Sequence, residues 1–337
     1  MPGGPAGAGA VRAVRAPGAV RDGAGLSESR WVSGEPVGSG ESGGDRGVRR
    51  GATGSRGRSR LRGRPVPDRG RAFLFRLRRV TRVLAVANQK GGVAKTTTVH
   101  ALGFSLAELG RRVLLIDLDP QACLTYSAGI DPDTLDRSLH DVFVRKMKAA
   151  DARRTLPGVD GLDILPSTID LAGSEVHLLT RTGREHVLAR ALVPVMDDYD
   201  VVLIDCPPSL GVLTINGLTA AQEVLIPLQC EALSHRGVGQ LLETIDDVRL
   251  FANADLQVRG VIATMYDERT RHARAVLDDV KERYGLPVFD PPVRKSIRFA
   301  EAPLNGQCIL QHAPHSPGAE AYRAIARQLD ADPRAAH

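Results

Sequence analysis

The chain has 337 residues, 42% of them hydrophobic, which is enough for one large α/β domain or two small ones around a substantial core. The formal net charge is +6, but residues 1–79 hold 17 Arg and 6 acids, whereas residues 80–337 hold 28 basic and 33 acidic residues. The positive charge therefore belongs to the first part of the chain. It does not by itself indicate that the main domain binds nucleic acid.

Residues 1–79 form a Gly/Arg-rich leader with neither helical nor strand periodicity, so we expect it to be disordered. It is open to interpretation as a basic arm for nucleic acid, as a solvated tail, or as the product of an overlong gene model. We favour the last, because Val80 stands directly before the first expected strand and a GTG start codon read internally gives valine. Intact-mass analysis of the native protein tests this hypothesis.

The four cysteines lack the C-x-x-C pairs and the His/Cys spacing of a zinc site. We therefore expect reduced thiols, with neither disulfides nor structural zinc. The sequence also contains no apolar run of the length that spans a bilayer and no secretory signal. These features favour a cytoplasmic protein that does not associate with a membrane.

From residue 80 onward, short β-branched apolar runs alternate with longer amphipathic segments, which is typical of βαβ units. The expected strands are 82–88, 113–117, 162–166, 201–205, 223–227, 257–265 and 287–289. The clearest expected helices are 95–109, 185–196, 237–251, 272–284 and 318–329. Residues 80–337 are thus predicted to form a single α/β domain, a doubly wound and mainly parallel sheet flanked by helices.

The first expected strand leads into the sequence Gln-Lys-Gly-Gly-Val-Ala-Lys-Thr-Thr at residues 89–97, before an amphipathic helix. Gly91 and Gly92 permit a tight turn whose N–H groups point inward, and the helix N-terminus favours an anion. In such a phosphate loop Lys95 reaches the β and γ phosphates, Thr96 binds Mg²⁺ and Thr97 supports the α phosphate.

The extra lysine within this loop, Lys90, resembles the signature lysine of the deviant Walker A group, K-G-G-x-G-K-[ST]-T. That group includes ParA, MinD and nitrogenase iron protein. The resemblance implies a P-loop NTPase fold and a homodimer in which Lys90 reaches the partner's nucleotide. Ala94 departs from the pattern, where glycine is usual. The implied ATP-binding residues are Lys90, Gly91, Gly92, Val93, Ala94, Lys95, Thr96 and Thr97.

Three aspartates follow apolar strands. Asp117 and Asp119 lie in a D-L-D-P-Q element similar to the D-x-D-P-Q of ParA proteins, which implies that Asp119 positions the hydrolytic water and that Asp117 supports the magnesium network. A helix cap or turn is the alternative for either residue. Asp205 ends a Walker B-like strand and would hold Mg²⁺ through water. Cys206 beside it is interpreted as a small buried hydrophobe rather than as a cluster ligand.

The resemblance to chromosomal ParA proteins, often called Soj, extends over residues 80–337. The segment 293–303 is similar to the family's I-P-R-N-V-R-L-S-E-A-P, with Arg294 in place of its proline. That segment borders the adenine in relatives. The family's nonspecific DNA-binding arginines match Arg269 and Arg298. Neighbouring cations that could extend a basic patch are Arg271, Arg274, Lys281 and Lys295.

The resemblance implies a slow Mg²⁺-dependent ATPase that converts ATP and water to ADP and phosphate. Its ATP-bound homodimer would bind double-stranded DNA, and a ParB-type partner would stimulate hydrolysis during chromosome or plasmid partitioning at the nucleoid. Alternatives are a ParA-like ATPase that positions a protein cargo and a MinD-like ATPase at the membrane. The sequence offers no evident cysteine pair for a metal-cluster reductase and no helix-turn-helix in the leader.

Overall fold

A computed structural model describes residues 81–230 and 234–331, so the predictions for residues 1–79 lie outside the described residues. Seven strands form one sheet in the order β3-β4-β2-β5-β1-β6-β7. The strands are β1 (Arg82–Val86), β2 (Val113–Asp117), β3 (Arg154–Thr155), β4 (Leu162–Leu165), β5 (Val201–Asp205), β6 (Glu223–Gln229) and β7 (Gln257–Thr264). Every neighbouring pair is parallel except β3 with β4, which confirms the predicted mainly parallel sheet.

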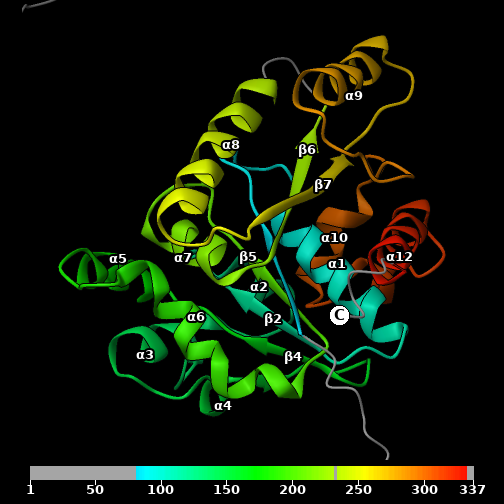
Figure 1. Cartoon of the computed structure of the whole chain (residues 1–337). Helices are drawn as coiled ribbons and strands as arrows, with labels where there is room; N and C mark the ends of the chain where they lie inside the picture. The colour runs from blue at the N-terminus through cyan, green and yellow to red at the C-terminus, as the bar shows by residue number, and fades with distance from the viewer. Residues whose placement is uncertain (1–80, 231–233, 332–337) are drawn as a thin grey trace, which may run out of the picture. The chain divides into compact units, whose positions relative to one another are not determined.

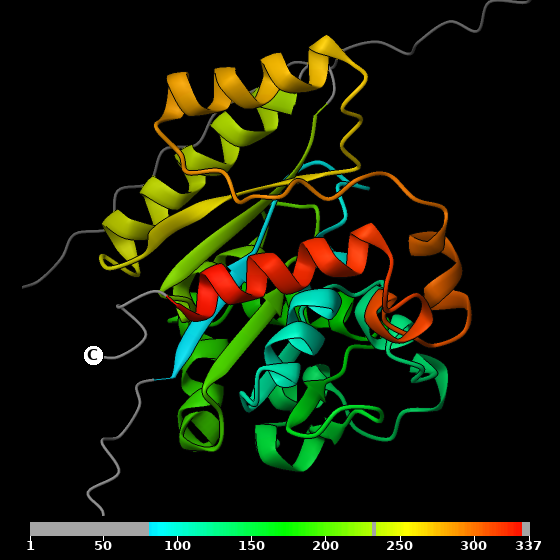
Figure 2. The same cartoon turned by 90° about the vertical axis from the view of Figure 1, so that its right-hand side faces the viewer.

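Helices cover both faces of this sheet (Figure 1). They are α1 (Lys95–Glu108), α2 (Cys123–Ser127), α3 (Leu139–Val144), α4 (Ala149–Ala152), α5 (Leu171–Leu179), α6 (Val187–Leu192), α7 (Val212–Ala220), α8 (Ser234–Phe251), α9 (Arg271–Tyr284), α10 (Arg298–Leu304), α11 (Ile309–His312) and α12 (Pro317–Asp330). On one face α12 lies along α1, as Figure 2 shows, and α3 and α5–α8 lie on the other.

The core consists of two apolar layers, one on each face of the sheet. Alternate residues of β1 belong to different layers: Leu84 and Val86 pack with α1 and α12, whereas Val83 and Ala85 pack with α7 and α8. Strands buried on both sides account for the continuous apolar runs in the sequence, because a parallel sheet leaves neither face in water.

Two predicted elements were wrong in detail, and prolines account for both. The expected helix 185–196 is divided into a 3₁₀ turn at Arg184–His186, α6, and a second 3₁₀ segment at Val193–Asp198, which contains Pro194. The expected strand 287–289 makes only an isolated bridge between Val261 and Val288. Prolines at 287, 291 and 292 lack the N–H groups that a longer ladder needs.

The central strands end together. Val86 on β1 is in register with Asp205 on β5, and Asp205 is in register with Asp117 on β2. The carboxyl ends of parallel strands are where open α/β sheets bind their ligands. The sheet therefore brings the phosphate loop and two of the predicted aspartates to one edge.

Candidate functional site

The phosphate loop begins at a buried asparagine that anchors it to the sheet. The Asn88 amide donates to the Pro227 carbonyl at 2.8 Å, and its oxygen accepts from the Lys90 backbone N–H at 3.0 Å. Further along, Gly92 and Ala94 have left-handed backbone conformations, with φ of 72° and 66°. Ala94 is the residue from which α1 starts, and its carbonyl accepts from Thr98 N at 2.9 Å. The loop therefore has the tight path that its two glycines predicted, with an alanine in a conformation that favours glycine.

Lys95 is buried at the start of α1, and its ammonium group donates to the Lys90 carbonyl at 3.2 Å. Burial lowers the pKa of Lys95, while the nearby carboxylates of Asp205 and Asp119 act in the opposite direction. A buried ammonium group facing carboxylates at a helix N-terminus is well suited to hold phosphate oxygens.

Asp205 is buried, and neither of its carboxylate oxygens has a hydrogen-bond partner of good geometry in the described part of the chain. Burial raises the pKa of Asp205 well above its usual range, and the charge of Asp117 adds to this effect, whereas the nearby Thr96 hydroxyl opposes it. A buried carboxylate without partners is costly unless a cation satisfies it. Asp205 and Thr96 therefore have the chemistry of a Mg²⁺ site.

Asp117 is fully buried, and both oxygens of its carboxylate accept hydrogen bonds from residues of the same chain. One oxygen accepts from the Thr125 N–H at 2.8 Å and from the Thr125 hydroxyl at 2.7 Å, and the other accepts from Asp119 N at 3.2 Å. Burial is the largest cause that raises the pKa of Asp117 to about 6. Asp117 thus fastens α2 and the loop that carries Asp119 to the end of β2.

Asp119 forms the turn that the sequence offered as an alternative, and its role in positioning water stays a prediction. Its Oδ1 accepts from Gln121 N at 2.9 Å, which closes a turn of the kind that aspartate favours. The residue also lines the cavity beside the phosphate loop, and its Oδ2 makes no hydrogen bond with the described residues. One oxygen therefore fixes the loop, while the residue as a whole lines the cavity.

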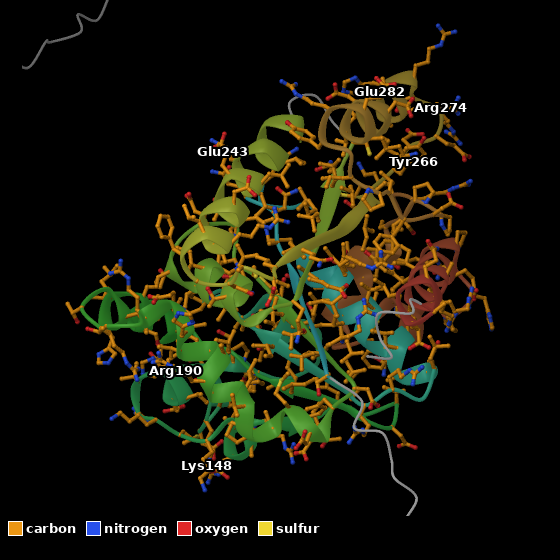
Figure 3. All side chains as sticks on the ribbon, viewed as in Figure 1. Lys148, Arg190, Glu243, Tyr266, Arg274 and Glu282 are labelled. Carbon is orange, nitrogen blue, oxygen red and sulfur yellow. The ribbon has the colours of Figure 1, made fainter. Side chains whose placement is uncertain are left out.

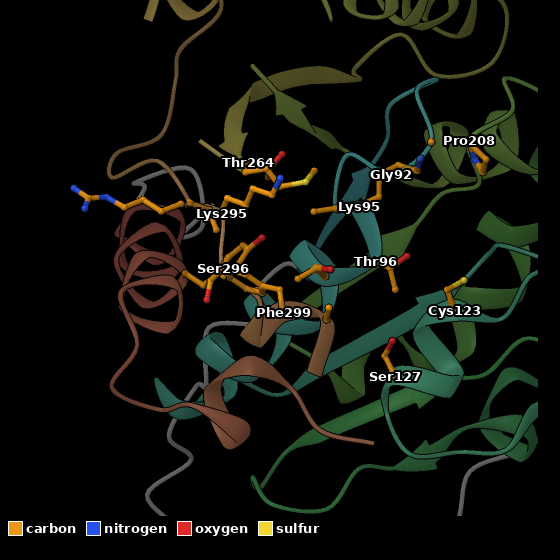
Figure 4. Close-up of a pocket in the computed structure, with 18 of the residues that line it drawn as sticks. Gly92, Lys95, Thr96, Cys123, Ser127, Pro208, Thr264, Lys295, Ser296 and Phe299 are labelled. Atoms are coloured by element: carbon orange, nitrogen blue, oxygen red, sulfur yellow. The ribbon is translucent and has the colours of Figure 1, made fainter. Parts of the chain in front are cut away.

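The cavity has a volume of about 530 Å³ and two walls of different origin. The phosphate-loop wall consists of Gly91, Gly92, Ala94, Lys95, Thr96 and Thr97. The opposite wall consists of Thr264, Met265, Val293, Arg294, Lys295, Ser296, Phe299, Ala300 and Tyr322. Figure 4 shows Lys295, Ser296 and Phe299 across the cavity from Lys95 and Thr96. The resemblance at 293–303 already indicated this segment, but Cys123 and Ser127 line the cavity without a signal in the sequence.

Lys90 is exposed and is not among the residues that line the cavity of its own subunit.

Cys206 is buried at 1% exposure, and burial raises its pKa. All four cysteines are free thiols. In the described part of the chain, no group of three or more His, Cys, Asp or Glu side chains is placed to hold a metal ion. Asp205 and Thr96 are too few to form such a group. Mg²⁺ bound together with a nucleotide nevertheless takes few ligands from the protein.

The two predicted DNA-binding arginines are both exposed, and the backbone brings their segments together. Tyr266 and Arg294 form a parallel bridge, so the loop that carries Arg269 lies beside the segment that leads into α10 at Arg298. Arg294 forms an ion pair with Glu268 at 2.6 Å. Arg274 projects from α9 (Figure 3). Within residues 81–230 and 234–331, no helix combines the length and apolar character needed to cross a membrane.

Comparisons with known proteins agree with this geometry. A family model described as an AAA domain, AAA_31, matches residues 81–258. The sporulation initiation inhibitor protein Soj of Bacillus subtilis is 42% identical over 251 residues, which are 74% of this chain and 99% of Soj. The chromosome partitioning protein ParA of Caulobacter vibrioides is 42% identical over 252 residues, 74% of this chain and 93% of ParA.

A solved structure from Mycobacterium smegmatis, described as cobyrinic acid a,c-diamide synthase with bound ADP and magnesium, is 54% identical with a TM-score of 0.66. The match covers 74% of this chain and 94% of that one. The family model thus spans more than half of the chain, and the Soj and ParA relatives align over nearly their whole lengths. This chain belongs to the ParA/Soj family of P-loop ATPases.

Proposed function

We propose that the protein is a Mg²⁺-dependent ATPase that dimerises around ATP, binds duplex DNA without sequence preference, and partitions chromosomes or plasmids with a ParB-type partner. The observation that carries this proposal is one cavity lined by the phosphate loop and Asp119, with a buried Asp205 near Thr96 whose carboxylate oxygens lack hydrogen-bond partners of good geometry among the described residues. The relatives named Soj and ParA, and the ADP and magnesium in the Mycobacterium smegmatis structure, support it.

Each nucleotide-binding residue has a role that follows from its position in the site. Residues 90–97 cradle the phosphates with backbone N–H groups, Lys95 holds the β and γ phosphates, and Thr97 supports the α phosphate. The Thr96 hydroxyl would hold Mg²⁺ directly and Asp205 would hold it through water, with Asp117 behind them. When bound, the ion neutralises charge on the transferring phosphoryl group. Asp119 orients the attacking water with the oxygen that its turn leaves unused.

Lys90 acts across the dimer interface. Its exposure, outside the lining of its own cavity, is compatible with a side chain that reaches the partner's nucleotide. A lysine supplied by the second subunit makes hydrolysis depend on dimerisation, because the transition-state charge lacks one of its stabilising cations in the monomer. The ATP-bound dimer is then the active state, and hydrolysis returns the protein to monomers.

DNA binds to the exposed cations around Arg269 and Arg298. The N-terminus of α9 carries Arg271 and Arg274, where cations oppose the helix dipole, so they cost stability rather than add to it. Cations at a position where they lower the stability of a helix are expected when they bind an anionic partner. Neutralisation of several phosphates makes the affinity fall steeply with salt. We place the protein in the cytoplasm, on the nucleoid, with slow turnover that the ParB-type partner accelerates.

The first experiment measures binding of the protein to an arbitrary DNA duplex with ATP, with ADP and without nucleotide. Wild type and Asp119→Ala should bind only with ATP, because the variant retains ATP without hydrolysing it. Lys90→Ala and Arg298→Glu should not bind. ATP-driven dimerisation without DNA binding at any salt would refute the nucleoid role. Anionic lipid vesicles and a pull-down of protein cargo then test the MinD-like and cargo-positioning alternatives.

The Mycobacterium smegmatis relative suggests a second candidate, an ATP-dependent synthase that forms amides on cobyrinic acid. The 54% identity favours it, whereas the relatives named Soj and ParA favour partitioning. Incubation with cobyrinic acid, ATP and either glutamine or ammonium distinguishes the two. A mass decrease of the acid by about one unit per amide formed, dependent on ATP, would establish the synthase; unchanged acid alongside ATP-dependent DNA binding would exclude it.

A further inference from the structure

The short helix α2 lies beside the nucleotide cavity, and its middle residue is Thr125. Cys123 and Ser127, at the two ends of the helix, line the cavity (Figure 4). Thr125 does not line it and is fully buried. A helix this short has little stability of its own, so its place in the fold depends on tertiary contacts. The contacts of Thr125 therefore decide where α2 sits.

The Thr125 hydroxyl joins the ends of two neighbouring strands. It donates to Asp117 Oδ2 at the end of β2 at 2.7 Å, and it accepts from the Ser167 N–H beyond β4 at 2.9 Å. β2 and β4 are parallel neighbours in the sheet. A hydroxyl has one hydrogen to donate, so the two bonds together fix its orientation. All three residues are fully buried, which makes the loss of either bond costly.

The same carboxylate also holds the loop that carries Asp119. Asp117 Oδ1 accepts from the Asp119 N–H at 3.2 Å, and Asp119 closes its own turn through Gln121 N. Between that turn and α2, Ala122 has a left-handed φ of 51°, which is unfavourable for a residue with a Cβ. Such a conformation persists where the surrounding contacts enforce it. Asp117 and Thr125 supply those contacts at the two ends of the loop.

We propose that Thr125 is a positioning residue for ATP hydrolysis, which acts through Asp117 to fix the loop on which Asp119 orients the attacking water. This inference rests on the proposed role of Asp119 and adds a residue to it. Because Thr125 does not line the cavity, its loss should affect the rate of hydrolysis and not the affinity for ATP. A displacement of about 1 Å at a reacting group can lower a rate by about 100-fold.

The test compares ATP hydrolysis with ATP binding in the full-length protein with Mg²⁺. Thr125→Val removes the hydroxyl but keeps the size of the side chain and the N–H bond to Asp117. It should lower kcat by about 10- to 100-fold, while the Kd of a non-hydrolysable ATP analogue changes by less than about twofold. ATP-dependent dimerisation, followed by light scattering, should be unchanged. Thr125→Ser retains the hydroxyl and should restore kcat to within about threefold of wild type.

The matched control removes a buried hydroxyl at the other end of the sheet. Thr81 directly precedes β1, and its hydroxyl donates to the Met196 carbonyl at 2.6 Å and lies 2.9 Å from the Tyr199 carbonyl oxygen. Thr81→Val should lower the midpoint of thermal unfolding as Thr125→Val does, but its kcat should equal that of wild type. If Thr125→Val does not fold, Thr125→Cys, with its weaker donor, should have a kcat below that of Thr125→Ser at an unchanged Kd.

The outcomes separate this role from the proposed function. If wild type hydrolyses ATP and Thr125→Val has the same kcat, the positioning role is refuted and the ATPase stands. A weaker Kd in Thr125→Val would place the residue in nucleotide binding instead. Equal losses of kcat in Thr125→Val and Thr81→Val would reduce it to a structural residue. If Asp119→Ala hydrolyses ATP as wild type does, the proposed role of Asp119 fails, and the role of Thr125 fails with it.

Discussion

The two walls of the nucleotide cavity are built in different ways. The phosphate-loop wall is a continuous strand, loop and helix, and its shape follows from backbone geometry at Gly92 and Ala94. The opposite wall combines the end of β7, the segment 293–300 and Tyr322 of α12, which tertiary packing alone holds together. The first wall therefore carries a motif, and the second depends on contacts between residues far apart in the chain.

The largest effect should come from the opposite wall. Tyr322 is fully buried, its hydroxyl is 3.0 Å from that of Thr98 on α1, and its ring lies edge-on to Phe299. Tyr322→Ala should reduce the free energy of unfolding by about 4 kcal/mol through cavity formation. Tyr322→Phe should cost only about 1 kcal/mol, because it removes the hydrogen bond alone. Chemical denaturation measures both; similar losses would mean that packing is not what holds this wall.

A substitution beside the phosphate-loop wall should change the rate of ATP hydrolysis rather than the stability of the protein. Asp205→Asn should reduce ATP hydrolysis by about 100-fold or more, about 3 kcal/mol in the barrier, because the ion loses the carboxylate that would hold it through water. The nucleotide-free variant should be at least as stable as wild type, since a neutral amide replaces a buried carboxylate without partners. Thermal unfolding with and without Mg²⁺ and ATP checks this; a large loss of stability without ligand would contradict it.

His100 lies on α1 behind the phosphate loop, and burial lowers its pKa to about 4. The unfolded chain, with a histidine pKa of about 6.5, binds the proton more readily, so this contribution to stability is complete above about pH 6.5 and is lost as the pH falls towards 4. At about pH 5 the loss should be about 2 kcal/mol. His100→Gln should remove this part of the pH dependence. Urea denaturation of wild type and His100→Gln, at about pH 5 and above about pH 6.5, measures the free energy of unfolding at each pH. An equal loss of stability in the two proteins at the lower pH would contradict the prediction.

Ala94 tests whether backbone geometry fixes the phosphate-loop wall. Its φ of 66° is unfavourable for a residue with a Cβ, so Ala94→Gly should stabilise the protein by about 1 kcal/mol despite the greater freedom of glycine in the unfolded chain. ATP affinity should be equal or higher, because the methyl group beside the phosphates is gone. The control is Ala107→Gly within α1, which should destabilise by about 1 kcal/mol.

The smallest effect concerns the rim of the opposite wall. Glu268 pairs with Arg294, and both side chains are more than half exposed. Glu268→Gln should barely change stability, since exposed ion pairs contribute little. It should strengthen DNA binding by about twofold to threefold at low salt, because Arg294 is released for phosphate and a repelling charge is removed. Titration at two salt concentrations measures this, and unchanged affinity at low salt would exclude Arg294 from the DNA surface.

The comparison of the two walls also explains which predictions succeeded. β2 and β5 were predicted residue for residue, and the long helices within a few residues, because their apolar periodicity is uninterrupted. The elements that were missed are shorter: β3, α2, α4 and α11 have five residues or fewer, and α3, α5, α7 and α10 have six to nine. Such lengths give too few residues for a period to be recognised with ease. The breaks near Pro194 and Pro287 show where local chemistry overrode an apparent pattern.

The sequence by itself determined the α/β class, the parallel sheet, the phosphate loop and the aspartates at the strand ends, because each is encoded by adjacent residues with a local physical cause. Only the tertiary structure decided that Asp117 fastens α2 through Thr125, that the Asp205 oxygens have no hydrogen-bond partner of good geometry among the described residues, and that Tyr322 lines the cavity. These features arise where distant segments meet, and their energies come from burial and charge that no local pattern records.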